Sequence, residues 1–260
     1  MPMAMNKLPL IESNPATWKD LQDAAGRILS ECGYHAETDK TIETVRGPVN
    51  VDVYASDTSR RPHITFLVEC KHWASAVPKT IVHAFRSVVS DFGANVGYIV
   101  SSLGFQSGAY TAAGNSPIRL VTWEEFQADF LDQWIENYFV PRVAEAADPL
   151  IEYTEPINTR IFRKADNLPE ERQSEFKALR NKYLGLGALS LPFSIRIRFF
   201  DRPQLELPLR TRVERLDRNE DIWMPDDLLD ACTLRGFLDA LCRNASLAIS
   251  EFDHVFGGRA

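Results

Sequence analysis

The sequence lacks the long apolar runs that a membrane span or a secretion signal requires. Its apolar stretches fall far short of the roughly 20 residues that cross a bilayer, and Met1–Lys7 has no charged start followed by an apolar core. The 4 cysteines lie far apart and form no C-x-x-C pair, which disfavours both a zinc site and a disulfide framework. We therefore expect a cytoplasmic protein with reduced thiols and no membrane partner.

The chain also lacks the basic excess that many nucleic-acid enzymes carry, because its net charge is -7. Residues 1–123 hold 11 basic and 11 acidic side chains, residues 124–150 hold 1 and 7, and residues 151–260 hold 17 and 18. Most of the negative excess thus lies in one short segment. The remainder can still present a local basic face, so charge neither supports nor excludes DNA as a partner.

What the sequence does contain is a series of short apolar runs separated by helical patterns. With 260 residues and 45% hydrophobic content, the chain can bury one large core or two modest ones. The runs that predict strands are Val49–Tyr54, Ile64–Cys70, Val96–Val100 and Ile118–Val121. Helical spacing is found after Asn14-Pro15, after Pro78 and over Phe105–Ala113. This order predicts an α/β fold with a parallel or mixed sheet and helices on its faces.

A long amphipathic helix is predicted over Trp123–Ala147, and it carries the acidic excess. Its aromatic stripe is typical of a packing seam. Pro149 to Pro156 has the composition of a linker. Beyond the linker we expect a charged helix near 169–183, a strand over Phe193–Phe200 and one or two helices between 225 and 251. The expected organisation is a domain at 1–123, an acidic helix at 124–150 and a smaller α+β domain at 151–260.

Charged side chains occur within two of the expected strands. Asp52 stands between two valines, and Glu69 and Lys71 close the run Ile64–Cys70. Side chains at i and i+2 of a strand share a face about 7 Å apart, so Glu69 and Lys71 point the same way. Two carboxylates and a lysine on neighbouring strands can hold a divalent metal and steady an attacking water. In the alternative without a function, Asp52 is an acid on an edge strand, and Glu69 and Lys71 form a solvated ion pair.

Three segments carry a resemblance to a known family. They are Gly47-Pro48-Val49-Asn50-Val51-Asp52-Val53, Val68-Glu69-Cys70-Lys71, and Gly97-Tyr98-Ile99-Val100-Ser101 with Gly104-Phe105. Over roughly residues 14–123 they resemble the Mrr-type restriction endonucleases of the PD-(D/E)-x-K nuclease superfamily. The resemblance implies a restriction-endonuclease-like mixed sheet flanked by helices. It also implies Mg²⁺ as cofactor, with Mn²⁺ able to substitute, and cleavage of DNA in restriction or defence against foreign DNA.

The resemblance further implies roles for individual residues. Asp52 and Glu69 would be metal ligands, and Lys71 would orient the attacking water. Many relatives place an acid on the first helix, where this chain has Gln22. Either Gln22 ligates the metal through its carbonyl oxygen, or Glu43 supplies the acid, or the site uses one metal, or turnover is slow.

Four further residues are candidates for contact with DNA. They flank the expected site in sequence and are His72, Lys79, Ser101 and Gln106. A histidine or lysine there can meet a phosphate, and the strand-to-helix turn can contact the backbone. Each also has a structural alternative as a loop or solvated side chain.

Two other functional hypotheses remain open. The chain could be a nuclease-like module that binds nucleic acid or a protein partner without cutting. Alternatively, residues 151–260 could dock a partner that switches a nuclease on, with the acidic segment occupying the DNA groove until it is displaced. A homodimer with Trp123–Phe139 as its seam is also an expectation of the family resemblance.

Overall fold

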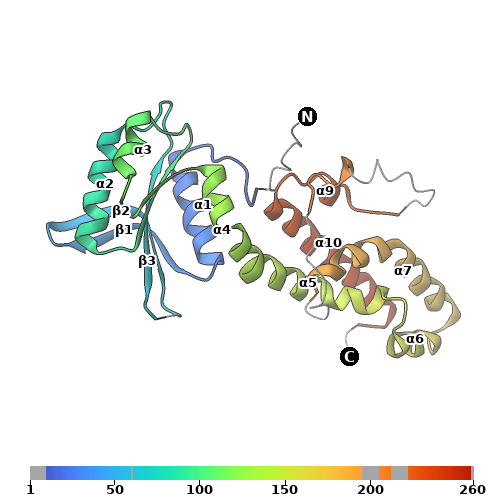
Figure 1. Cartoon of the computed structure of the whole chain (residues 1–260). Helices are drawn as coiled ribbons and strands as arrows, with labels where there is room; N and C mark the ends of the chain where they lie inside the picture. The colour runs from blue at the N-terminus through green and yellow to red at the C-terminus, as the bar shows by residue number, and fades with distance from the viewer. Residues whose placement is uncertain (1–9, 60, 195–204, 212–221, 259–260) are drawn as a thin grey trace. The chain divides into compact units, whose positions relative to one another are not determined.

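The computed structural model describes residues 10–59, 61–194, 205–211 and 222–258. The chain divides into two compact units, one spanning Ser13–Asn137 and the other comprising Met1–Glu12 with Tyr138–Ala260 (Figure 1). We call them the sheet unit and the helical unit. The contact boundary thus falls after the first half of the long helix, whereas the sequence placed a boundary at residue 123.

The sheet unit contains the five strands and four α-helices of the first half of the chain. The strands are β1 (His35–Thr44), β2 (Gly47–Asp57), β3 (Ile64–Lys71), β4 (Val96–Ser101) and β5 (Ile118–Thr122). The helices are α1 (Trp18–Glu31), α2 (Lys79–Phe92), α3 (Ser107–Ala113) and α4 (Trp123–Trp134). These elements confirm the four sequence-predicted strands and the helices between them.

The five strands form one mixed sheet in the order β1-β2-β3-β4-β5. The pairs β1–β2 and β2–β3 are antiparallel, while β3–β4 and β4–β5 are parallel. Parallel neighbours need a crossover connection, and α2 and α3 supply the two crossovers. The α/β class and the mixed sheet flanked by helices are therefore as the sequence predicts.

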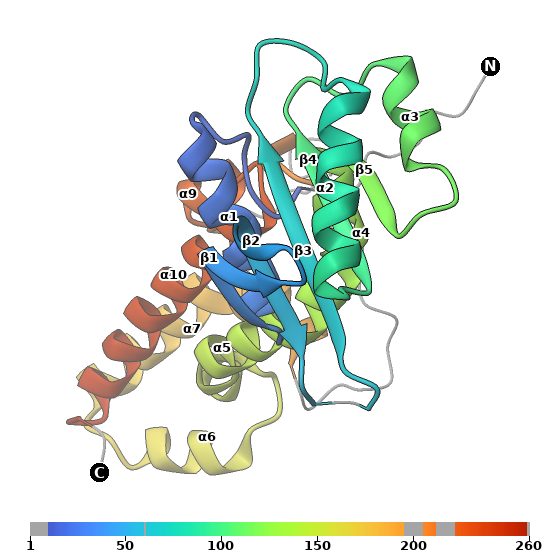
Figure 2. The ribbon, with the colours of Figure 1, turned by 90° about the vertical axis from the view of Figure 1, so that its left-hand side faces the viewer.

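Helices cover both faces of the sheet. In Figure 1, α2 and α3 lie on one side of the strands, and α1 and α4 lie on the other. Figure 2 looks onto the first of these faces, with α2 in front of β3 and β4. Because both faces are covered, β4 is a continuous apolar run instead of an alternating one, with every residue from Gly97 to Ser101 buried.

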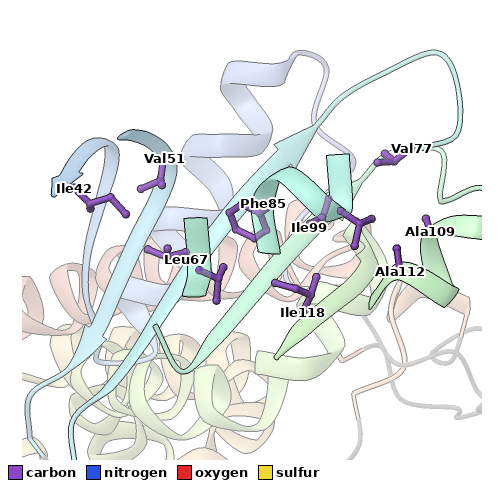
Figure 3. Packing of buried hydrophobic residues seen from close by; sticks show 11 residues of the cluster. Ile42, Val51, Leu67, Val77, Phe85, Ile99, Ala109, Ala112 and Ile118 are labelled. Carbon is purple, nitrogen blue, oxygen red and sulfur yellow. The ribbon is translucent and has the colours of Figure 1, made fainter. Parts of the chain in front are cut away.

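The core under α2 and α3 is built from branched aliphatic side chains of the sheet. Its strand residues include Ile42, Val51, Leu67, Ile99 and Ile118. Figure 3 shows these side chains gathered with Phe85 of α2. This core fixes the positions of β2 and β3, the two strands that carry the predicted site.

The first helix begins later than the sequence predicts. Thr17, and not Asn14, is the N-cap of α1, because its side chain accepts from the Asp20 backbone N–H while the Asp20 carboxylate accepts from the Thr17 N–H. This reciprocal capping box satisfies two donors at the helix start, which Asn14 followed by Pro15 does not do. The shift matters because it makes Trp18 the first helical residue.

The long acidic helix is present but is interrupted. A π-helical turn over Ile135–Phe139 separates α4 from α5 (Val140–Thr154). Pro141 lies in the first turn of α5, where proline is tolerated. The predicted linker from Pro149 to Pro156 is wrong for most of its length, since Pro149 lies inside α5 and the helix continues to Thr154.

The aromatic stripe of this helix is a packing seam within the sheet unit. Phe126 and Phe130 pack on Tyr98, with ring centroids 5.5 and 5.6 Å away. Both phenylalanines and Trp134 are buried. These three side chains are therefore used within the sheet unit, and a homodimer through this helix stays a prediction.

The described part of the helical unit contains α5 and four further α-helices. They are α6 (Thr159–Asp166), α7 (Glu170–Ser190), α9 (Asp226–Leu229) and α10 (Leu234–Val255). Helices α5, α7 and α10 pack against one another. From residue 195 the strand predicted over Phe193–Phe200 lies outside the described residues, and Leu191–Phe193 is a 3-10 turn. No described helix is long and apolar enough to cross a membrane.

Candidate active site

Asp52 lies on β2 and reaches across to the end of β3. Its carboxylate accepts a hydrogen bond of 2.6 Å from the backbone N–H of Cys70. The last paired residues of β2 and β3 are Val53 and Val68, so Asp52 lies one residue beyond the end of the ladder. The carboxylate thus takes a β3 donor at the point where the ladder stops, and this contact holds Asp52 beside Glu69 and Lys71.

The electrostatic surroundings of Asp52 oppose its ionisation. Burial raises the pKa of the Asp52 carboxyl, and the nearby negative charge of Glu69 raises it further. The Cys70 N–H, the Lys71 ammonium and a hydrogen bond from the Trp18 side chain act in the opposite direction on this pKa. The net pKa is raised, as expected for two carboxylates that share a half-buried site.

Glu69 and Lys71 form an ion pair on one face of β3, between the lysine Nζ and the glutamate Oε1. Both side chains are largely covered, with 24% of Glu69 and 14% of Lys71 exposed. Cys70, between them, points to the opposite face and is buried, and burial raises the pKa of its thiol. The i, i+2 spacing thus places the two charged groups together, as the sequence predicts.

Gln22 lies beside the site, but its side-chain amide is engaged at both ends. Its Nε2 donates to the backbone carbonyl of Asp52 at 2.8 Å, and its Oε1 accepts from Lys19 Nζ at 3.0 Å. Gln22 is also buried. The oxygen that would serve as a metal ligand accepts from a lysine here, and the amide nitrogen fixes the backbone of β2; metal ligation by Gln22 stays a prediction.

Glu43, the alternative acid, is far from Asp52 along the hairpin. Glu43 pairs with Pro48, whereas Asp52 lies opposite Asp39, between the pairs Thr38–Val53 and Lys40–Val51. Four residues along a strand correspond to about 13 Å. The structure therefore does not bring Glu43 to the site, and the acid nearest in register is Asp39.

The carboxylates of Asp52 and Glu69 are suited to one Mg²⁺ ion. Magnesium binds through one or two protein carboxylates and takes its remaining ligands from phosphate and water. Burial is the main cause of the raised pKa of Asp52, and the negative charge of Glu69 adds to it; a cation between the carboxylates would relieve this second part. Among the described residues no group of three His, Cys, Asp or Glu side chains is arranged to hold a metal.

His72 follows the site directly but contacts protein. Its Nε2 lies 3.2 Å from the carbonyl oxygen of Pro15. This contact ties the segment after β3 to the segment before α1. The structure thus gives His72 a positioning role at the site, and contact with DNA stays a prediction.

Ser101 is buried and its hydroxyl is used within the turn that follows β4. The hydroxyl donates to the Gly104 carbonyl at 3.0 Å and accepts from the Leu103 N–H at 3.3 Å. Its neighbour Ser102 donates from both backbone and side chain to the Lys71 carbonyl at 3.2 Å. These serines fix the end of β3, and contact of Ser101 with DNA stays a prediction.

Lys79 and Gln106 are exposed residues at the starts of α2 and α3. Gln106 is the N-cap of α3, and its backbone N–H donates to Val77. An isolated bridge between Val77 and Phe105 joins the two loops. Both predicted DNA-contact residues therefore lie on adjoining loops at the end of β3 and β4, the end that also carries Lys71.

Sequence reasoning missed two residues that touch the site. Trp18 lies near Asp52 and lowers the pKa of its carboxyl, and Lys19 donates to Gln22. The only sequence signal for them is the Thr17–Asp20 capping pattern, which would have placed both at the start of α1.

Comparison with known families gives one match. Residues 14–128 match the family model of the Mrr catalytic domain, described as a restriction endonuclease. The search of curated proteins found no match.

Three solved structures are similar to parts of the chain. The protein of unknown function AF1548 is 16% identical, with 65% of this chain and 98% of that chain covered and a TM-score of 0.37. The MspJI restriction endonuclease bound to a 27-mer oligonucleotide is 14% identical over 47% and 29% of the two chains, with a TM-score of 0.32. The DNA modification-dependent restriction endonuclease AspBHI is 15% identical over 49% and 42%, with a TM-score of 0.29. The chain thus spans less than half of either restriction enzyme.

Proposed function

We propose that the chain is a Mg²⁺-dependent endonuclease that hydrolyses phosphodiester bonds of DNA, because residues 14–128 match the family model of the Mrr catalytic domain, a restriction endonuclease. The observation that carries the proposal is the meeting of Asp52, in the middle of β2, with Glu69 and Lys71 at the end of β3. Restriction or defence against foreign DNA is the setting that the family suggests.

In this proposal Asp52 and Glu69 hold the cation. The raised pKa of Asp52 falls when a cation offsets the unfavourable neighbour charge, so metal binding favours its ionised form. A bound Mg²⁺ lowers the pKa of water and offsets charge on the scissile phosphate, and Mn²⁺ can supply the same chemistry.

Lys71 supplies the positive charge beside the reacting atoms. In the structure its ammonium is paired with Glu69. With Glu69 holding a cation, the Lys71 ammonium would be able to donate to the attacking water or to a phosphate oxygen. An oriented donor in a half-buried site stabilises charge that develops in the transition state.

The test is incubation of the purified chain with supercoiled and linear DNA, methylated and unmethylated, in Mg²⁺, Mn²⁺ or EDTA. We expect cleavage with either metal and none in EDTA. Loss of one such electrostatic donor costs about 10²–10³-fold in rate, so Lys71→Ala should cut at least about 100-fold more slowly.

The matched control is Lys182→Ala, which removes a lysine paired with Glu251 in the helical unit and should leave cleavage unchanged. If no DNA substrate is cut with either metal, or if Lys71→Ala cuts as fast as the parent chain, the proposal is wrong.

A second function is favoured by one observation. The amide oxygen of Gln22 faces Lys19 and not the site, which leaves fewer metal ligands and fits a module that binds DNA or a protein partner without cutting it. DNA binding that is unaffected by EDTA, together with an absence of cleavage, would support this alternative.

A further inference from the structure

Two exposed tryptophans belong to the candidate site. Of the 5 tryptophans, Trp123 and Trp134 are buried, whereas Trp18, Trp73 and Trp223 are 44%, 39% and 42% exposed. Leaving a large apolar ring in water costs free energy that burial would recover. Trp18 and Trp73 are therefore of interest, because both lie against the charged residues of the site.

Trp73 stands beside Lys71. The lysine Nζ lies 5.6 Å from the centroid of the Trp73 ring, within the range of a cation–π contact. The ring is thus next to the ammonium that would face a phosphate, yet more than a third of the residue remains open to solvent.

Trp18 approaches the site from the first helix. Its side chain lies near enough to the Asp52 carboxylate to lower the pKa of that group. The contact between His72 and Pro15 draws together the two segments that carry the tryptophans, at the end of β3 and before α1. The exposed indole of Trp18 therefore lies near Asp52, and that of Trp73 lies beside Lys71.

A nucleotide combines the two chemistries that this arrangement offers. Its phosphate is suited to the cation site and to Lys71, and its base is suited to an aromatic face. Bases stack on exposed aromatic rings with little regard to sequence, because every base has a π-face. In a duplex both faces of a base are covered by its neighbours, so this stacking is open only to a base outside the double helix.

We propose that Trp73, assisted by Trp18, stacks on the base of an unpaired nucleotide next to the phosphate held at Asp52, Glu69 and Lys71. The chain then prefers single-stranded DNA, or a nucleotide displaced from a duplex, at its reacting position. This inference rests on the proposed function, because it takes the same site to hold a phosphate, and it names the substrate class of that site.

The test is a binding titration with a fluorescein-labelled 20-nucleotide single strand and with the matched duplex, with Ca²⁺ replacing Mg²⁺ to limit turnover. Stacking on one base is worth a factor of about ten or more in affinity. Trp73→Ala should weaken single-strand binding by about tenfold and change duplex binding less than about twofold. Trp73→Phe should restore most of the loss, and Trp73→Leu, which is apolar but not aromatic, should not.

Trp223→Ala is the matched control, since it removes an equally exposed tryptophan of the helical unit and should change neither affinity. Intrinsic fluorescence gives a second readout. The single strand should quench the emission of the parent chain and of Trp223→Ala, and should quench Trp73→Ala clearly less. Circular dichroism of each variant shows whether it is folded.

The inference is overturned if Trp73→Ala binds both DNAs as the parent does, if it weakens both equally, or if no DNA binds. Its failure differs from failure of the proposed function. Metal-dependent cleavage with an unaltered strand preference in Trp73→Ala rejects only the stacking, whereas selective single-strand binding without cleavage under any metal rejects only the hydrolysis.

Discussion

The environment of the Asp52 carboxylate opposes its negative charge. Its pKa is raised by burial and by Glu69. Between the unfolded and folded pKa values the folded chain binds more protons than the unfolded chain, so stability falls as pH rises through that window. Above the folded pKa the whole cost is present.

Asp52→Asn should therefore stabilise the metal-free chain at neutral pH. The amide oxygen of the substituted side chain can still accept from the Cys70 N–H, but it carries no charge to oppose Glu69. For a unit of this size about 1 kcal/mol corresponds to roughly 2–4 °C in melting temperature, and we expect an upward shift of this order in EDTA by differential scanning fluorimetry.

Mg²⁺ should reverse the order of the melting temperatures of the parent chain and Asp52→Asn. The ion should raise the melting temperature of the parent chain and leave that of Asp52→Asn nearly unchanged, because binding to the folded state alone stabilises it. A fall in the melting temperature of the variant in EDTA would show that the carboxylate charge is favourable and that the site needs no cation.

The elements of the sheet unit place the site through close packing of α2 on β4. Gly97 of β4 is the point of closest approach. A Cβ added there would lie 2.6 Å from Val89 Cγ2, 2.8 Å from Ile118 Cδ1 and 2.9 Å from Phe85 Cε1. Such distances are too short for carbon atoms, so a side chain at this position forces α2 away from the strand.

Gly97→Ala should lower the free energy of unfolding by about 1–3 kcal/mol, the usual cost of overpacking a core. Urea denaturation followed by circular dichroism measures the change. Gly108→Ala in α3 is the matched control, because its Cβ would meet Lys79 Cδ at an ordinary 3.6 Å and alanine favours helix. Equal effects of the two substitutions would contradict the packing argument.

At the scale of elements, pattern reasoning succeeded where local chemistry decides the outcome. The strands follow from apolar runs. Helix α2 follows from Pro78 before its first residue and from Gly93 at its end, where the left-handed φ of 79° suits glycine. The linker prediction was wrong because it treated Pro149 as a helix break. In the structure α5 continues past Pro149, and its buried side chains continue with it. Tertiary packing outweighed the local signal there.

At the scale of the whole molecule, the acidic segment is largely accounted for by intramolecular contacts. Glu125 caps α4, Asp129 pairs with Arg119, and Asp148 accepts from Ser194. These partners explain the cluster of charge without a second function. The idea that the segment covers a DNA groove stays a proposal, and a folded chain lacking residues 124–260 that cut no faster would speak against it.

The described start of the chain is built into the helical unit. Ile11 is fully buried, and the backbone N–H groups of Leu234 and Arg235 donate to Leu10 and Ile11. Glu12 and Arg235 form an ion pair at 2.5 Å, with side chains only 9% and 16% exposed. The chain therefore passes from one unit to the other twice, after residue 12 and after residue 137.

Arg235→Ala should destabilise the helical unit strongly. Removing one partner of a buried ion pair leaves the other charge in a poor environment, which typically costs about 3–5 kcal/mol. Arg243→Ala, on the same helix but paired with Asp227 at the surface, should cost no more than about 1 kcal/mol. Urea titrations of both variants measure these losses of stability. Similar unfolding midpoints for the two variants would mean that the buried pair of Glu12 and Arg235 contributes little.

The sequence alone determined the strands, the crossover order and the shared face of Glu69 and Lys71, because these follow from periods of two and 3.6 residues and from turn residues. Only the tertiary structure decided that Asp52 meets the end of β3, that the Gln22 oxygen faces Lys19, and that Trp18 and Trp73 lie beside the charges. The bond between Asp52 and Cys70 joins residues 18 positions apart, and it depends on strand register, which no local pattern encodes.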